Sequence, residues 1–144
     1  MVKPDEEAIE IATQQIKTDE GLSLMPYHCT ADVLTIGYGR AIGTNGISED
    51  EAEHLLRNDV KVAALDARKY IGDTHYDVLS VQRQAVLINM AFNLGASRLR
   101  QFKLLKKAII DGDFEEAKVQ MLDSKWAEQT KGRATRLADI MCNN

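Results

Sequence analysis

The stretch TDEGLSLMPYHCTADVLTIGYG, residues 18–39, decides the fold and carries most of the candidate chemistry. An N-terminal helical pattern ends here, because Gly21 follows its last periodic residue and glycine is typical just past a helix. Apolar residues then alternate at 22–24 and 33–38, and Thr30-Ala31-Asp32 supplies a turn between them. The stretch therefore predicts a helix end followed by a small β-hairpin.

Glu20 is the last acidic residue of that helical pattern. The C-terminal end of a helix carries partial negative charge, which disfavours a carboxylate and favours the protonated form that a general acid needs. The alternative is an ordinary surface glutamate at a helix end. The residues alone leave both interpretations open.

The same stretch resembles the active-site signature of the phage-type lysozymes, the endolysin muramidases of glycoside hydrolase family 24. Eight residues separate Glu20 from Cys29 and five separate Cys29 from Thr35, as in that signature, and DEG, Tyr27 and TIGYG surround them. The resemblance extends over residues 8–138. It includes the segment AVLINMAFNLG and a Trp-x-x-Gln-Thr-x-x-Arg pattern carried by Trp126, Gln129, Thr130 and Arg133.

The resemblance implies a catalytic set in which Glu20 donates a proton to the leaving oxygen while Cys29 and Thr35 handle the attacking water. Position 29 holds Asp or Cys in this family, and a thiol acts as a base only when it is deprotonated. Three interpretations of Cys29 stay open: a thiolate base, a passive residue, or the nucleophile of a different enzyme class. Asp32 is a nearby carboxylate that could substitute for it.

Further residues are expected to bind substrate or to orient other groups. By resemblance Arg133 orients Glu20, and Asn93 faces the substrate groove, although a structural role for Asn93 is equally consistent with its residue type. Asn89, one helical turn earlier, is assigned a structural role. The expected binding or orienting residues are Arg133, Asn93, Tyr27, Asp32, Gln129 and Thr130.

The resemblance also implies an α+β, mostly helical fold of the phage-lysozyme type, with a small β-hairpin lobe and a helical lobe joined by a long helix. We expect residues 1–144 to form a single lysozyme domain: residues 18–47 the active-site lobe, 48–71 the linking helix, and 72–144 with 5–17 the helical lobe. Local sequence signals agree with these expected boundaries. Ser48 and Glu51 form a capping box, and the apolar run up to Leu94 predicts a buried helix from Ser80.

The amino-acid composition limits the classes of partner that the chain is expected to bind. With a net charge of −4 the chain has no basic footprint for nucleic acid, and no apolar run is long enough to span a membrane. The N-terminus lacks the pattern of a signal peptide, so we expect accumulation in the host cytoplasm and holin-dependent release to the wall. No metal or cofactor motif occurs, and nothing demands more than a monomer.

The predicted function is an endolysin muramidase that hydrolyses the β-1,4 bond between N-acetylmuramic acid and N-acetylglucosamine in bacterial peptidoglycan, leading to host lysis. Three alternatives remain open. A lytic transglycosylase would need only one catalytic acid. A cysteine peptidase or amidase would use Cys29 with a histidine, and a non-catalytic wall-binding or virion module would bind without releasing product.

Overall fold

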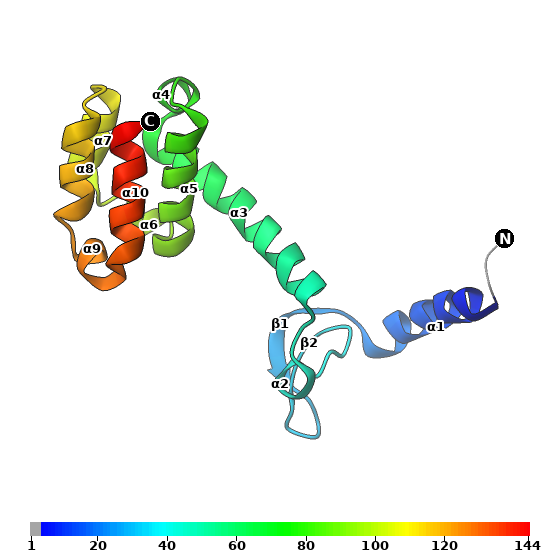
Figure 1. Ribbon diagram of the computed structural model, residues 1–144. Helices are drawn as coiled ribbons and strands as arrows, with labels where there is room; N and C mark the ends of the chain where they lie inside the picture. The colour runs from blue at the N-terminus through cyan, green and yellow to red at the C-terminus, as the bar shows by residue number, and fades with distance from the viewer. Residues whose placement is uncertain (1–3) are drawn as a thin grey trace. The chain divides into compact units, whose positions relative to one another are not determined.

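A computed structural model describes residues 4–144, and contacts within the chain divide it into two units (Figure 1). The first unit ends at Ala52, and the second runs from Glu53 to Asn144. The described residues are mostly helical, with one two-stranded antiparallel sheet in the first unit. The predicted mostly helical α+β fold is therefore confirmed. The placement of residues 5–17 with the helical lobe stays a prediction.

The first unit opens with helix α1 (Pro4–Glu20), followed by strands β1 (Ser23–His28) and β2 (Leu34–Gly37). The predicted helix stop is confirmed, because Gly21 has φ 68° and its N–H donates to the carbonyl of Lys17 at 3.1 Å. Glycine adopts this left-handed conformation without the steric cost that a Cβ imposes.

The predicted hairpin is also confirmed. Its turn is closed by the N–H of Asp32, which donates to the carbonyl of Cys29 at 2.8 Å, and Asp32 has φ 59°, a conformation that aspartate tolerates. Tyr27 pairs with Thr35 in the ladder, whose register shifts between Ser23 and Tyr27. Pro26, which has no N–H to donate, lies within that interval.

A short helix, α2 (Ile42–Asn45), follows β2. By residue type, Gly43-Thr44-Asn45-Gly46 predicts a turn at this point. Its backbone closes helical i→i+4 bonds, in which Asn45 donates to Ala41 and Gly46 donates to Ile42. Gly46 then ends the turn with φ 61°. The structure therefore has one turn of helix where the residue types predict a turn.

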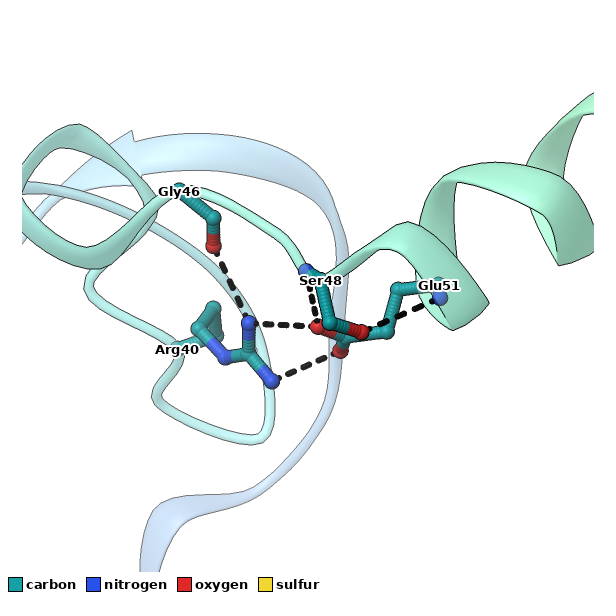
Figure 2. Close-up of polar contacts among 4 residues, drawn as sticks. All are labelled: Arg40, Gly46, Ser48 and Glu51. Carbon is teal, nitrogen blue, oxygen red and sulfur yellow. Dashed lines mark hydrogen bonds and ion pairs between the residues drawn. The ribbon is translucent and has the colours of Figure 1, made fainter.

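The long helix α3 (Glu49–Ile71) begins at the predicted capping box, as Figure 2 shows. The Glu51 carboxylate accepts the N–H of Ser48 at 2.9 Å, while the Ser48 hydroxyl accepts the N–H of Glu51 at 3.1 Å. Arg40 forks onto the same carboxylate at 2.9 and 2.6 Å and also donates to the carbonyl of Gly46 at 3.0 Å. Arg40 thereby ties the segment after the hairpin to the first turn of α3.

Acid should weaken this junction in a way that depends on Arg40. The Arg40 guanidinium, and then the backbone at Ser48, lower the pKa of Glu51 to about 2. Because the folded-state pKa lies below the unfolded value of about 4.3, the pair stabilises the fold above that pH and ceases to do so as pH falls towards 2.

Urea unfolding followed by circular dichroism should show that Arg40→Met lowers the free energy of unfolding at pH 7, and that this loss shrinks steadily below pH 4.5. A penalty that is independent of pH would contradict this assignment, and Arg57→Met, which breaks the exposed pair with Glu53 on α3, is the control expected to change stability little.

The second unit is a helical bundle built around α5 and α10, which lie side by side with α8 next to α10 (Figure 1). Its helices after α3 are α4 (Asp73–Asp77), α5 (Val81–Leu94), α6 (Ala96–Leu99), α7 (Lys103–Ile110), α8 (Phe114–Leu122), α9 (Lys125–Thr130) and α10 (Gly132–Asn143). The predicted buried helix is confirmed in α5, which is capped by the Ser80 side chain. Its fully buried members include Val86, Leu87 and Met90.

Polar side chains inside this bundle donate hydrogen bonds to backbone carbonyls at helix ends. The Tyr70 hydroxyl donates to the carbonyl of Phe102, and burial raises the Tyr70 pKa. Arg83 donates to the carbonyls of Met141 and Cys142 at 2.7 and 3.1 Å, so it caps the end of α10 from α5. Both side chains join segments far apart in the sequence. No helix within residues 4–144 has the length and hydropathy to cross a membrane.

Candidate active site

Glu20 lies at the C-terminal end of α1, and its carboxyl group packs against the backbone of Gly39. A Cβ built on Gly39 would come within 3.0 Å of the Glu20 Oε2 and 3.1 Å of its Cδ. Gly39 also has φ 79°, which an L side chain rarely adopts. The second glycine of TIGYG is therefore required both for its backbone conformation and for the space that Glu20 occupies.

A second contact joins the same two segments. The Lys17 Nζ lies 5.7 Å from the centre of the Tyr38 ring, within the range of a cation–π interaction. Lys17 is one turn before Glu20, and Tyr38 is next to Gly39. The end of α1 is thus held against the segment that follows β2.

Cys29 and Thr35 lie together at the hairpin turn. Thr35 is buried, and its hydroxyl donates to the carbonyl of Val33 at 2.8 Å. With that proton engaged, the Thr35 oxygen can still accept a hydrogen bond from water. The backbone at Val33, then that at Ala31, lowers the pKa of the half-buried Cys29 thiol, and Thr35 acts in the same direction. A lowered pKa increases the fraction of thiolate near neutral pH.

The two other candidates in this unit occupy different parts of the hairpin. Asp32 is at the exposed tip, and its Oδ1 lies 3.3 Å from the Nδ1 of His28. Tyr27 is on β1, opposite Thr35 in the ladder, and is 38% exposed. The hairpin therefore brings Tyr27, Cys29, Asp32 and Thr35 within a few residues of one turn.

In the second unit Asn93 and Trp126 form a hydrogen-bonded pair. The indole N–H of Trp126 donates to the Asn93 Oδ1 at 2.7 Å, and the Trp126 ring meets the edge of Phe102 at 6.3 Å between centroids. Asn93 itself is exposed, so its amide N–H groups are available to a ligand. Both expected roles of Asn93 are compatible with this geometry, because its oxygen bonds to the buried Trp126 while the residue itself is exposed.

The rest of the Trp-x-x-Gln-Thr-x-x-Arg pattern spans the break between α9 and α10. The Thr130 hydroxyl donates to the carbonyl of Trp126 at 2.9 Å, which leaves its oxygen as an acceptor, while Gln129 is exposed on α9. Lys131, with φ 45°, separates the two helices. Arg133 follows in the first turn of α10.

Arg133 is oriented by Asn89, a residue to which the sequence assigned only a structural role. Its Nε and Nη2 both donate to the Asn89 Oδ1, at 3.0 and 2.6 Å. The pair lines a groove of about 440 Å³ whose other walls are apolar. The spacing of Asn89 and Asn93 on one side of α5 was the available signal, but it could not show that their partners would be Arg133 and Trp126.

The candidate residues thus form two contacts in each unit: Glu20 with Gly39 and Cys29 with Thr35 in the first, and Asn89 with Arg133 and Asn93 with Trp126 in the second. Within residues 4–144 no group of three or more His, Cys, Asp or Glu side chains is arranged to hold a metal ion. The chemistry available from the side chains themselves is proton transfer by a carboxyl group and a thiol, with a cation and amides to orient groups.

Comparison with known proteins shows which family the sequence matches. The family described as Phage lysozyme matches residues 17–139. The endolysin of Acyrthosiphon pisum secondary endosymbiont phage 1 is 32% identical, with 88% of this chain and 84% of that protein covered. Probable T4-type lysozyme 2 of Dictyostelium discoideum is 29% identical, with 87% and 89% covered. The pre-baseplate central spike protein Gp5 of Enterobacteria phage T4 is 30% identical over 89% of this chain, which spans only 27% of that protein.

Proposed function

Because the chain belongs to the phage lysozyme family, we propose that it hydrolyses the β-1,4 bond between N-acetylmuramic acid and N-acetylglucosamine in bacterial peptidoglycan and thereby brings about host lysis. The membership confirms the resemblance seen in residues 18–39 and identifies the chain as a glycoside hydrolase of the lysozyme type. The observation that carries the proposal is the Glu20 carboxyl group held against Gly39, in one unit with Cys29 and Thr35.

In the proposed reaction Glu20 donates its proton to the glycosidic oxygen as the bond from that oxygen to the anomeric carbon breaks. Water supplies the new oxygen on the anomeric carbon and gives up a proton to the Cys29 thiolate. The Thr35 oxygen accepts a hydrogen bond from the same water, and Glu20 is reprotonated from solvent when the thiol releases its proton. The lowered pKa of Cys29 supports this assignment, because it makes the thiolate more available as a base.

The remaining candidates supply binding and orientation in this proposal. Arg133 orients Glu20, as the family resemblance implies, and the exposed amide of Asn93 donates to a substrate oxygen. Tyr27, Gln129 and Thr130 add contacts to the glycan. The protein accumulates in the host cytoplasm and reaches the wall after a holin opens the membrane.

A second candidate function is lytic transglycosylation of the same bond. The observation that favours it is the absence of a carboxylate at position 29, because a transglycosylase needs one acid and closes the muramic residue into an anhydro ring without adding water. The similarity to a spike protein favours a third candidate function, that of a non-catalytic virion module that binds bacterial walls.

Mass spectrometry of purified peptidoglycan digested by the protein separates these functions. If the protein is a muramidase, the released glycan fragments should have ordinary reducing muramic ends and intact peptide stems. Anhydro-muramic ends would replace it with transglycosylation, and cleaved stems on intact glycan strands would point to a peptidase or amidase built on Cys29. Binding to the wall without any soluble fragment would support the non-catalytic module.

A further inference from the structure

Tyr38 lies at the tip of a short loop whose backbone is fixed on both sides. Ile36 and Arg40 exchange two backbone hydrogen bonds, each of 2.9 Å, and so close a loop of the three residues between them. The glycines on either side of Tyr38 have φ 71° and 79°, in the left-handed region that favours glycine. The Tyr38 ring, which is 43% exposed, is therefore held next to the residue against which Glu20 packs.

On α1 the side chain of Lys17 has one acidic neighbour at the spacing of a helical contact, which is Glu20, three residues later. Asp19 is two residues away, and side chains at that spacing do not face each other on a helix. In the part of the chain that the structure describes, however, no ion pair joins Lys17 to Glu20. The Lys17 Nζ lies instead over the Tyr38 ring, 5.7 Å from its centre. The ring, and not the Glu20 carboxyl group, is the partner of the Lys17 ammonium.

The position of the Lys17 charge matters to an acid catalyst. A cation beside a carboxyl group favours its ionised form, whereas a general acid must be protonated when it meets the leaving oxygen. At an exposed site the attraction of a cation to the face of an aromatic ring is at least as strong as an ion pair between side chains three residues apart on a helix. The Tyr38 ring therefore competes effectively with Glu20 for the ammonium.

We propose that Tyr38 is a positioning residue, whose ring holds the Lys17 ammonium away from Glu20 and so leaves the Glu20 carboxyl group free to keep and deliver its proton. This inference rests on the proposed function, because it concerns the acid of that reaction. It differs from a purely structural contact between α1 and the loop, since the loss of such a contact would have the same effect whichever partner is removed.

The other charged groups near Glu20 do not act in the place of Lys17. Asp19 carries the opposite charge, and the Arg40 guanidinium is already engaged by the Glu51 carboxylate at 2.9 and 2.6 Å. Arg133, which the proposed function brings to Glu20, is the same in wild type and in every variant of the test. A difference among those variants therefore reports on the Lys17 charge.

Substitutions at both partners separate the proposed role from a structural one. Tyr38→Leu removes the ring and releases the ammonium to Glu20. The alkaline limb of the pH profile of kcat/KM on peptidoglycan should then move about 0.2–0.4 pH unit to lower pH, with a loss of about twofold on that limb. Lys17→Met removes the cation and should leave the limb in place, and the double variant should restore it. Tyr38→Phe, the matched control, keeps the ring and should match wild type.

NMR titration of the Glu20 carboxyl carbon in the free protein tests the inference without the reaction. The midpoint of the titration should fall in Tyr38→Leu and return in the double variant with Lys17→Met. About 1 M NaCl should abolish the difference, because salt at that concentration screens exposed charges beyond about 3 Å. If the midpoint is the same in wild type and Tyr38→Leu, or falls equally in Tyr38→Leu and Lys17→Met, the proposal is wrong.

The same titration distinguishes failure of this inference from failure of the proposed function. A wild-type protein that releases no glycan fragment would overturn the muramidase, while the expected set of midpoints would leave the role of Tyr38 towards Lys17 and Glu20 standing. Release of reducing muramic ends with the alkaline limb unmoved in Tyr38→Leu would leave the muramidase standing and overturn the role of Tyr38.

Discussion

Replacing Glu20 with glutamine is expected to lower the rate of peptidoglycan hydrolysis by about 10²–10⁴-fold, the usual contribution of a positioned general acid. Glutamine has nearly the same shape as glutamate, so the packing against Gly39 should be retained. What the change removes is the proton that the leaving oxygen must receive. The measurement is the initial rate of release of new reducing ends, with circular dichroism to establish that the variant is folded.

Glu10→Gln is the matched control for this experiment. Glu10 is an exposed acid on the same helix, where its carboxylate accepts a hydrogen bond from Gln14 at 3.0 Å. The same change of charge at position 10 should leave the rate within a factor of about two, since a surface position away from the site contributes little. A Glu20→Gln rate within tenfold of wild type would show that another group donates the proton.

Replacing Trp126 with alanine is expected to have the largest effect on stability, a loss of about 3–5 kcal/mol in the free energy of unfolding. The ring is 3% exposed and packs edge-to-face on Phe102, so alanine would leave a large cavity in the core of the second unit. It would also remove the indole N–H that supports Asn93. We therefore expect activity to fall even under conditions in which the variant remains folded.

Urea unfolding followed by far-UV circular dichroism checks this expectation. Fluorescence is unsuitable because the chain contains a single tryptophan. Trp126→Phe keeps most of the packing and loses the indole N–H, so it should cost clearly less than alanine, and Val78→Ala, at an 80% exposed position, should cost under about 0.5 kcal/mol. A Trp126→Ala penalty no larger than that of Val78→Ala would contradict the described core.

Local interactions explain which parts of the fold could be predicted. Gly21, the Ser48–Glu51 capping box and the Ser80 cap each act over three or four residues, and all three mark helix ends in the structure. The turn at Asp32 is equally local. At residues 43–46 the residue types predict a turn, whereas the structure has one turn of helix. Residue type does not distinguish the two, because turn residues are compatible with both.

The sequence by itself determined the helix ends, the hairpin, the family and the identity of the candidate acid, because these depend on residue type and short spacing. Only the tertiary structure decided the partners: Gly39 for Glu20, Glu51 for Arg40, and Asn89 for Arg133. Arg133 and Asn89 are 44 residues apart, and no pattern along the chain indicates which amide an arginine will meet. That choice depends on how helices pack, which is set by the many apolar contacts of the core acting together.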